Sequence, residues 1–155
     1  MKKVLMAMVA VAAVAMAGVS WAASTTPLTV NANVVGTCKF TGGNPPLAFG
    51  DLDPSQDTLK QASVDVQFWC TKGSAAAPTF SAGNGNNFAG STRNMVGPGG
   101  DIIPYSIDSF TADGNPNTGP GTPRMVTILG TVPANSYSDK TFGAYSDTVT
   151  LTITP

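Results

Sequence analysis

The residue types that most often carry catalysis are scarce in this chain. It has no histidine, so the commonest general base is absent, and it has no Gly-x-Ser-x-Gly nucleophile motif. Asp51, Asp53 and Asp57 form the one acidic cluster, which could in principle supply a glycosidase carboxylate pair or calcium ligands. Pro54 and the missing Gly and Glu of a calcium loop favour a solvated turn instead. We therefore predict no catalytic residue, no metal site and no cofactor.

Cys38 and Cys70 are the only two cysteines. Two sulfur ligands with no histidine anywhere make a poor zinc site. In an oxidising compartment an even number of cysteines predicts a disulfide. Closing a loop of this size contributes roughly 3–4 kcal/mol to stability in the chain-entropy model. We expect Cys38 and Cys70 to be bonded.

The first 22 residues predict that the chain reaches such a compartment. Lys2 and Lys3 precede an apolar run over residues 4–19, and Ser20 and Ala22 place small residues at the −3 and −1 positions of a cleavage site. A membrane anchor is the alternative, because the run is almost long enough to span a bilayer. Its richness in alanine and the good cleavage site favour a signal peptide over residues 1–22, and hence export.

The composition predicts an all-β protein that does not bind nucleic acid. The formal net charge is −1, with 17 Gly, 12 Pro and no Glu, which favours turns over long helices. There is no basic patch to contact phosphates. The Gly83-Asn84-Gly85-Asn86-Asn87 segment precedes no helix, so it is a loop and not a phosphate cradle. Arg93 is expected either to pair with an Asp across a strand or to contact a ligand.

Alternating apolar residues predict several strands. The pattern is clear over residues 62–70 and 148–154, and residues 124–132 are apolar on both faces. Residues 103–107 also alternate, but Pro104 makes this an edge strand or a bulged one. Shorter strands are expected at residues 38–40, 47–49 and 78–82. Short strands separated by frequent turns predict one β-sandwich domain.

The segment before Cys38 also alternates, with apolar residues at Leu28, Val30, Ala32 and Val34. It can be the first strand of the chain's own sandwich, or a free strand at a new N-terminus. The pattern alone favours the first interpretation.

A set of motifs occurs in a fixed order along the chain. After the N-terminal strand and Cys38 come Phe49-Gly50-Asp51-Leu52-Asp53, the strand ending at Cys70, Gly83-Asn84-Gly85, Arg93-Asn94-Met95, Tyr105, and Gly143-Ala144-Tyr145-Ser146-Asp147 followed by a Thr-rich strand. The ordered set resembles the spore coat protein U family, whose members include pilins of archaic chaperone–usher systems. Pro104, and Pro155 in place of a penultimate aromatic residue, depart from the family pattern.

The resemblance implies an incomplete immunoglobulin-like β-sandwich over residues 37–155, one strand short. Residues 23–36 would then be a donor strand, placing Leu28, Val30, Ala32 and Val34 in a neighbouring subunit. The implied partners are identical or related pilin subunits, a periplasmic chaperone and an outer-membrane usher. The implied product is a structural pilus at the cell surface, with no enzymatic activity, and its role in biofilm formation, adhesion or a coat stays open.

Two other functions stay open at this point. The first is a self-contained secreted sandwich that binds carbohydrate or protein, with the N-terminal strand in its own sheet. The second is a secreted hydrolase that uses Asp pairs.

Overall fold

The computed structural model describes residues 22–74 and 77–155, and within these the fold is all-β. The compact unit begins at Val34, and residues 22–33 belong to a separate unit. Apart from Ala22, the predicted signal peptide lies outside the described residues. Within the described ranges, no helix is long and apolar enough to cross a membrane.

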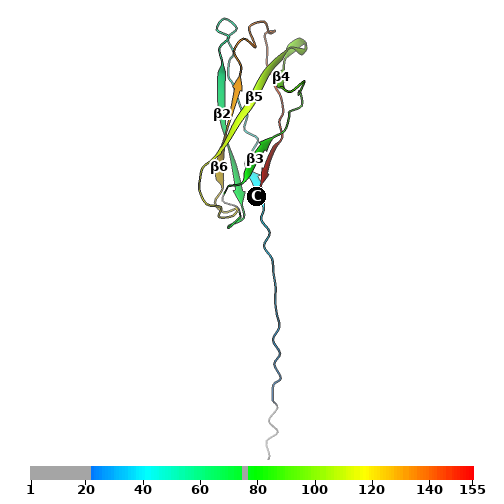
Figure 1. Cartoon of the computed structure of the whole chain (residues 1–155), viewed down its shortest axis with the longest axis vertical. Coiled ribbons are helices and arrows are strands. Elements are labelled where there is room, and N and C mark those ends of the chain that lie inside the picture. Colours follow the sequence, from blue (N-terminus) through cyan, green and yellow to red (C-terminus); the bar gives the residue numbers. More distant parts are fainter. Residues whose placement is uncertain (1–21, 75–76) are drawn as a thin grey trace, which may run out of the picture. The chain divides into compact units, whose positions relative to one another are not determined.

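The compact unit is a sandwich of antiparallel strands with an immunoglobulin-like arrangement (Figure 1). One sheet has five strands in the order β1-β2-β6-β5-β4, and the other pairs β3 with β7. The strands are β1 (Cys38–Thr41), β2 (Lys60–Cys70), β3 (Thr79–Ala82), β4 (Arg93–Val96), β5 (Ile102–Ala112), β6 (Arg124–Val132) and β7 (Leu151–Thr154). A single 3-10 turn, η1 (Pro98–Gly100), joins β4 to β5.

The centre of the large sheet follows directly from the sequence pattern. In β2, Val66, Phe68 and Cys70 are buried and alternate with Asp65 and Gln67, which are exposed. Strand β6 lies antiparallel to β2 and buries its alternate residues in the same way. These two strands therefore contribute the buried residues at the centre of the main hydrophobic cluster.

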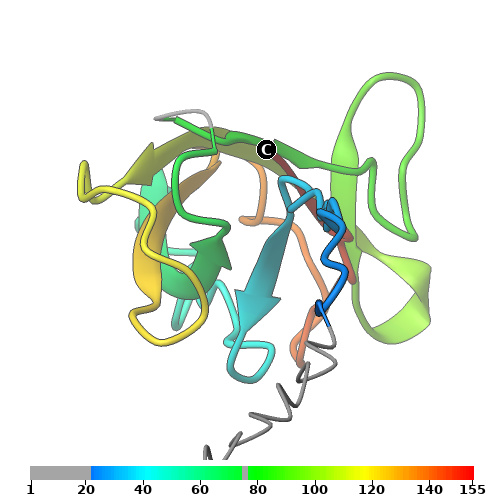
Figure 2. The same cartoon turned by 90° about the horizontal axis from the view of Figure 1, so that it is seen from below.

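Phenylalanines join the two sheets. The ring of Phe80, in β3, lies 5.1 Å from that of Phe68, 6.1 Å from that of Phe110 and 6.4 Å from that of Phe40, measured between ring centroids. These spacings suit aromatic packing. Figure 2, which looks along the strands, shows the sheets curled around this shared interior.

Strand β5 is not an edge strand, contrary to one of the two interpretations of Pro104. It lies between β6 and β4, and its ladder with β6 begins only at Ser106. The missing N–H of Pro104 therefore removes no hydrogen bond to β6. The other interpretation, a bulge, is confirmed a few residues further on, between Ile107 and Ser109.

The strand predicted at residues 47–49 is wrong. Leu47 and Phe49 are half-buried, as alternation requires, but the segment belongs to no sheet. Their side chains lie over Gly130: a Cβ added there would be 2.7 Å from Leu47 Cδ2 and 3.4 Å from Phe49 Cζ. The alternating pattern here reflects packing onto a sheet face without a hydrogen-bonded ladder.

Candidate functional site

Two strand edges of the compact unit lie next to each other and are not paired. Strand β1 is at one end of the large sheet and β7 is at one end of the small sheet. They contact each other but share no ladder. The opposite edge of the large sheet, β4, is partly covered, because Val96 and Ser146 exchange both backbone hydrogen bonds. We call the unpaired edges of β1 and β7 the β1/β7 edges.

The core is incompletely covered beside the β1/β7 edges. Every buried member of the main hydrophobic cluster comes from β2 or β6. The members contributed by the outer strands are only partly buried, including Cys38, Phe40, Phe80, Leu151 and Ile153. An unpaired edge with apolar side chains below it is a template on which another strand can add.

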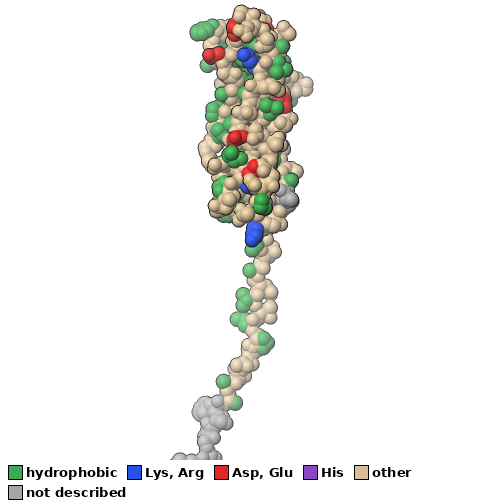
Figure 3. Space-filling model, turned by 90° about the vertical axis from the view of Figure 1, so that its left-hand side faces the viewer, with side chains coloured by type: hydrophobic (Ala, Val, Ile, Leu, Met, Phe, Trp, Pro, Cys, Tyr) green, Lys and Arg blue, Asp and Glu red, His purple; other side chains and the backbone are tan. Residues whose placement is uncertain are grey.

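The N-terminal segment carries exposed apolar side chains. Leu28 is 86% exposed, Val30 82% and Val34 81%, and Ala32 is also exposed. Within the described ranges, residues 22–36 belong to no sheet. Figure 3 shows isolated apolar side chains along the segment.

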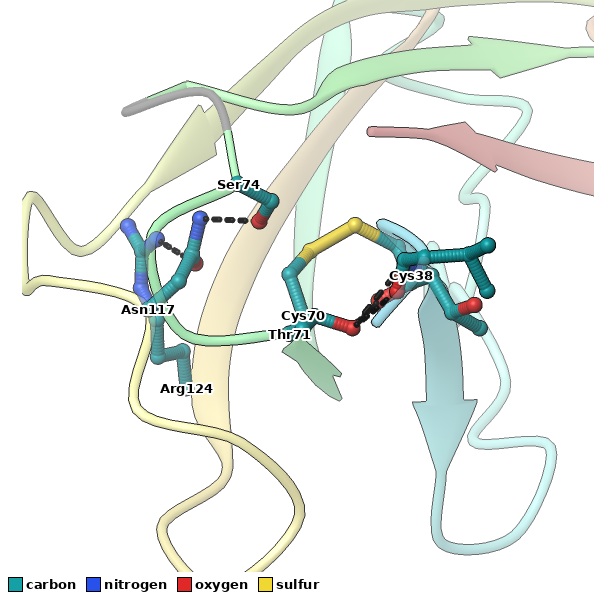
Figure 4. The surroundings of a disulfide bond; sticks show 8 residues. Cys38, Cys70, Thr71, Ser74, Asn117 and Arg124 are labelled. Atoms are coloured by element: carbon teal, nitrogen blue, oxygen red, sulfur yellow. Dashed lines mark hydrogen bonds between the residues drawn. A yellow bond between two sulfur atoms is a disulfide. The ribbon is translucent and has the colours of Figure 1, made fainter. Parts of the chain in front are cut away.

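A disulfide fixes the start of β1. Cys38 and Cys70 lie directly opposite in the β1–β2 register and are bonded. Thr71 forms hydrogen bonds beside the disulfide (Figure 4). Its N–H donates to the Thr37 carbonyl (2.8 Å), and its hydroxyl lies 3.3 Å from the carbonyls of Thr37 and Val35. A four-residue edge strand is thus held covalently in place.

A buried arginine closes the same end of the core. Arg124 is 4% exposed; its Nε donates to Asp113 (2.9 Å), its Nη1 donates to Asn117 (2.6 Å), and its guanidinium lies 5.1 Å from the Phe68 ring centroid. Burial raises the pKa of Asp113, but hydrogen bonds from Arg124 and the Met125 N–H outweigh it and hold that pKa at about 2. Arg124 is therefore a structural cation.

Asp53 and Asp57, two of the three clustered aspartates, have different contacts, and the prediction of a purely solvated turn is wrong for Asp57. Asp53 accepts from the N–H and hydroxyl of Ser55 within the turn, and these bonds lower its pKa. Asp57 accepts from the N–H groups of Ser136 (3.1 Å) and Ser138 (3.2 Å). Within the described residues, no group of three or more His, Cys, Asp or Glu is placed to hold a metal.

Comparison with known proteins places the chain in a family. A family model described as the Spore Coat Protein U domain matches residues 24–152. The chain belongs to the spore coat protein U family. Curated protein sequences give no significant match.

One solved structure that this chain resembles is a chaperone–tip adhesion subunit pre-assembly complex from the archaic chaperone–usher Csu pili of Acinetobacter baumannii. The match has 17% sequence identity and a TM-score of 0.46, and covers 78% of this chain and 40% of that chain. This chain thus spans less than half of the chain that it matches, and similarity at this level assigns no function.

Several motifs of the spore coat protein U pattern meet at one carboxylate. Asp147 Oδ2 accepts from the Tyr105 hydroxyl (2.6 Å), and Asp147 Oδ1 accepts from the N–H groups of Asn86 (3.0 Å) and Asn87 (3.2 Å) and from the Asn87 side-chain amide (3.0 Å). Burial, together with this hydrogen bond to Asp147, raises the pKa of Tyr105 far above its usual range. The Gly-Asn loop thus cradles a protein carboxylate.

Arg93, another motif residue, supports the same loop. Its Nε donates to the Gly83 carbonyl (2.8 Å) and its Nη2 to the Ala82 carbonyl (3.0 Å). Among the described residues Arg93 forms no ion pair with an Asp, so that alternative is wrong, and the arginine instead holds the backbone of this loop.

Gly85→Ala should destabilise the domain more than Gly90→Ala. Both glycines have positive φ (+85° and +67°), which costs an L-residue about 1–2 kcal/mol. A methyl group at Gly85 would in addition overlap Asp147 Oδ2, whereas at Gly90 it would meet open space. The clash adds roughly 1–3 kcal/mol. Thermal unfolding of the two variants measures the difference, and equal unfolding temperatures would contradict the role of the Asp147 cradle.

Sequence reasoning found the apolar residues of the N-terminal segment but missed some of the partly buried residues beside the β1/β7 edges. Leu151 and Ile153 stood out by alternation, whereas Phe40 and Phe80 lie in strands too short to show a period. Their exposure beside the β1/β7 edges depends on which strands are neighbours, and no local pattern encodes that.

Proposed function

We propose that this chain is a structural subunit of a surface pilus, assembled by donor-strand exchange through a chaperone–usher pathway. In this proposal, residues 23–36 of one copy add between β1 and β7 of the next. One observation carries the proposal: the same chain contains both a surface that lacks a strand and a strand that could fill it. The surface is the β1/β7 edges, which have no ladder partner and lie over a partly buried core. The strand is the N-terminal segment, with its exposed, alternating apolar residues.

The size and chemistry of the segment support this role. At roughly 3.3 Å per residue, nine residues in extended form span about 30 Å, enough to run the length of a sandwich. Leu28, Val30, Ala32 and Val34 would face the half-covered core, and each Leu or Val that becomes fully buried contributes roughly 1.5–3 kcal/mol. Backbone hydrogen bonds to both edges would add to this without depending on sequence.

The remaining parts of the proposal follow from the same exposure. A signal peptide over residues 1–22 would export the chain, and an unpaired apolar edge needs a protecting partner before assembly. A periplasmic chaperone and an outer-membrane usher would supply that protection and the route to the cell surface. We also propose that the subunit is not an enzyme, since its cysteines are bonded and Asp57 and Asp147 serve as structural acceptors.

Pili from the native host test the proposal directly. Unheated extracts on denaturing gels should show a ladder whose steps equal one processed subunit, and boiling should collapse the ladder to a single band. Such ladders are expected because a fully buried strand dissociates slowly.

The rival function is a self-contained secreted binding module. It would give monomers at every concentration in size-exclusion chromatography and no ladder before boiling. That outcome would contradict the pilus proposal.

A further inference from the structure

A shallow, open polar cleft lies outside the β1/β7 edges. It lies between the β4–β5 hairpin and residues 135–140, and its volume is about 650 Å³. Pockets for small ligands in proteins commonly measure 300–1,000 Å³. Neither the disulfide nor the Asp147 cradle contributes to its walls.

The most constrained polar group in the wall is Asn94. This side chain is 4% exposed, and its Nδ2 donates to the carbonyls of Asn87 and Thr92, both at 3.1 Å. With both amide hydrogens committed, the polar atom left over is Oδ1, which accepts no hydrogen bond from the described residues. Asn94 is one of the residues that line the cleft, so its buried amide leaves one acceptor oxygen there without a described donor.

Hydrogen bonds to Asp57 fix the opposite wall, which residues 135–140 form. The Asp57 carbonyl accepts from the Asn135 N–H (3.2 Å), and its carboxylate accepts from the N–H groups of Ser136 and Ser138. Burial raises the pKa of Asp57, but these hydrogen bonds outweigh burial and the pKa lies below its ordinary value. Asn135 has φ +59°, a conformation that asparagine tolerates well. A wall fixed before binding lowers the entropic cost of binding.

The chemistry of the lining points to a neutral polyol. Its one basic residue, Lys140, lies 2.8 Å from Asp139, so the lining carries no net charge. The Thr92 hydroxyl and the Asn135 amide provide donors and acceptors, whereas the Ser136 hydroxyl already donates to the Pro133 carbonyl. Ile102, which is 45% exposed, and Pro104 form an apolar strip beside them. Hydroxyl groups alternating with C–H faces are the signature of a sugar.

We propose that this cleft binds a neutral saccharide, with Asn94 Oδ1 accepting from a sugar hydroxyl and Ile102 and Pro104 contacting a C–H face. The site does not require the pilus role, since all its walls belong to the compact unit of one subunit.

A glycan array, followed by saturation-transfer NMR, tests the proposal on the purified full chain. The probes are neutral mono- and oligosaccharides of glucose, galactose, mannose and N-acetylglucosamine. At least one should bind, and Thr92→Val and Asn135→Gly should each weaken binding about tenfold or more. Asn135→Gly keeps the positive φ, so the backbone of the wall should stay in place.

Asn44→Gly is the matched control, because Asn44 is exposed and lies outside this cleft. Thermal unfolding should show that all three variants stay folded. Absence of binding by every probe, or binding that survives both cleft variants, would overturn the saccharide site. Neither result would affect the ladder that tests the pilus proposal.

Discussion

Val30→Asp should abolish polymer formation while leaving the subunit folded. The Val30 side chain is 82% exposed in the free segment, so a carboxylate there costs nothing before assembly. Inside a neighbour the same carboxylate would be buried without a partner, losing the roughly 1.5–3 kcal/mol of the valine and adding several kcal/mol of desolvation. The ladder in unheated extracts should disappear, and chaperone-bound subunit should accumulate in the periplasm.

Thr29→Asp is the matched control, because alternation places Thr29 on the opposite face of the same strand. Its ladder should be only mildly reduced. If Val30→Asp removed the chaperone-bound subunit as thoroughly as the ladder, the segment would belong to the subunit's own fold. The donor-strand proposal would then be wrong.

Cys70→Ser should reduce the free energy of unfolding by roughly 3–4 kcal/mol, a large share of the 5–15 kcal/mol typical of a domain. Cys70 is 1% exposed, so the serine hydroxyl would in addition be buried in an apolar site. The variant should therefore be poorly recovered from the periplasm. Denaturant titration of whatever is recovered gives the loss directly.

The double variant Cys38→Ser/Cys70→Ser serves as the control for an unpaired thiol. It should be as unstable as the single variant, because both lack the loop-closing bond. Alkylation of the unreduced wild-type protein followed by mass spectrometry should label neither cysteine. Labelling of both, or near-normal stability of the double variant, would contradict a stabilising disulfide.

Local patterns predicted most of the strands, because a half-buried strand shows its burial in its own alternation. Residues 62–70 are the clear case, whereas residues 124–132, apolar on both faces in sequence, bury only alternate residues beside them at the centre of the sheet. The segment at residues 47–49 shows the limit of this reasoning. Its alternation is real, but it serves packing over Gly130, and alternation does not report whether a backbone has a ladder partner.

Side-chain roles that depend on distant residues were harder to predict. Asp57 resembled a solvated turn residue in the sequence, but in the structure its carboxylate accepts hydrogen bonds from Ser136 and Ser138. Asn94 shows the same difficulty, because its burial depends on hydrogen bonds to the carbonyls of Asn87 and Thr92 that no local pattern encodes. Contacts across such sequence separations follow from strand order, which composition and periodicity do not specify.

The strand order also bears on how fast the chain can fold. Thr79 pairs with Thr154 and Lys60 with Val132, and only β4 and β5 are joined by a tight turn. Folds dominated by such distant pairings form in milliseconds to seconds, far more slowly than folds built from local contacts. Leu151 and Ile153 must arrive before the core is covered on their side, so β2 and β6 expose their apolar faces throughout that interval. Self-association during this slow search competes with correct folding, and the competition becomes more severe as the rate of synthesis rises.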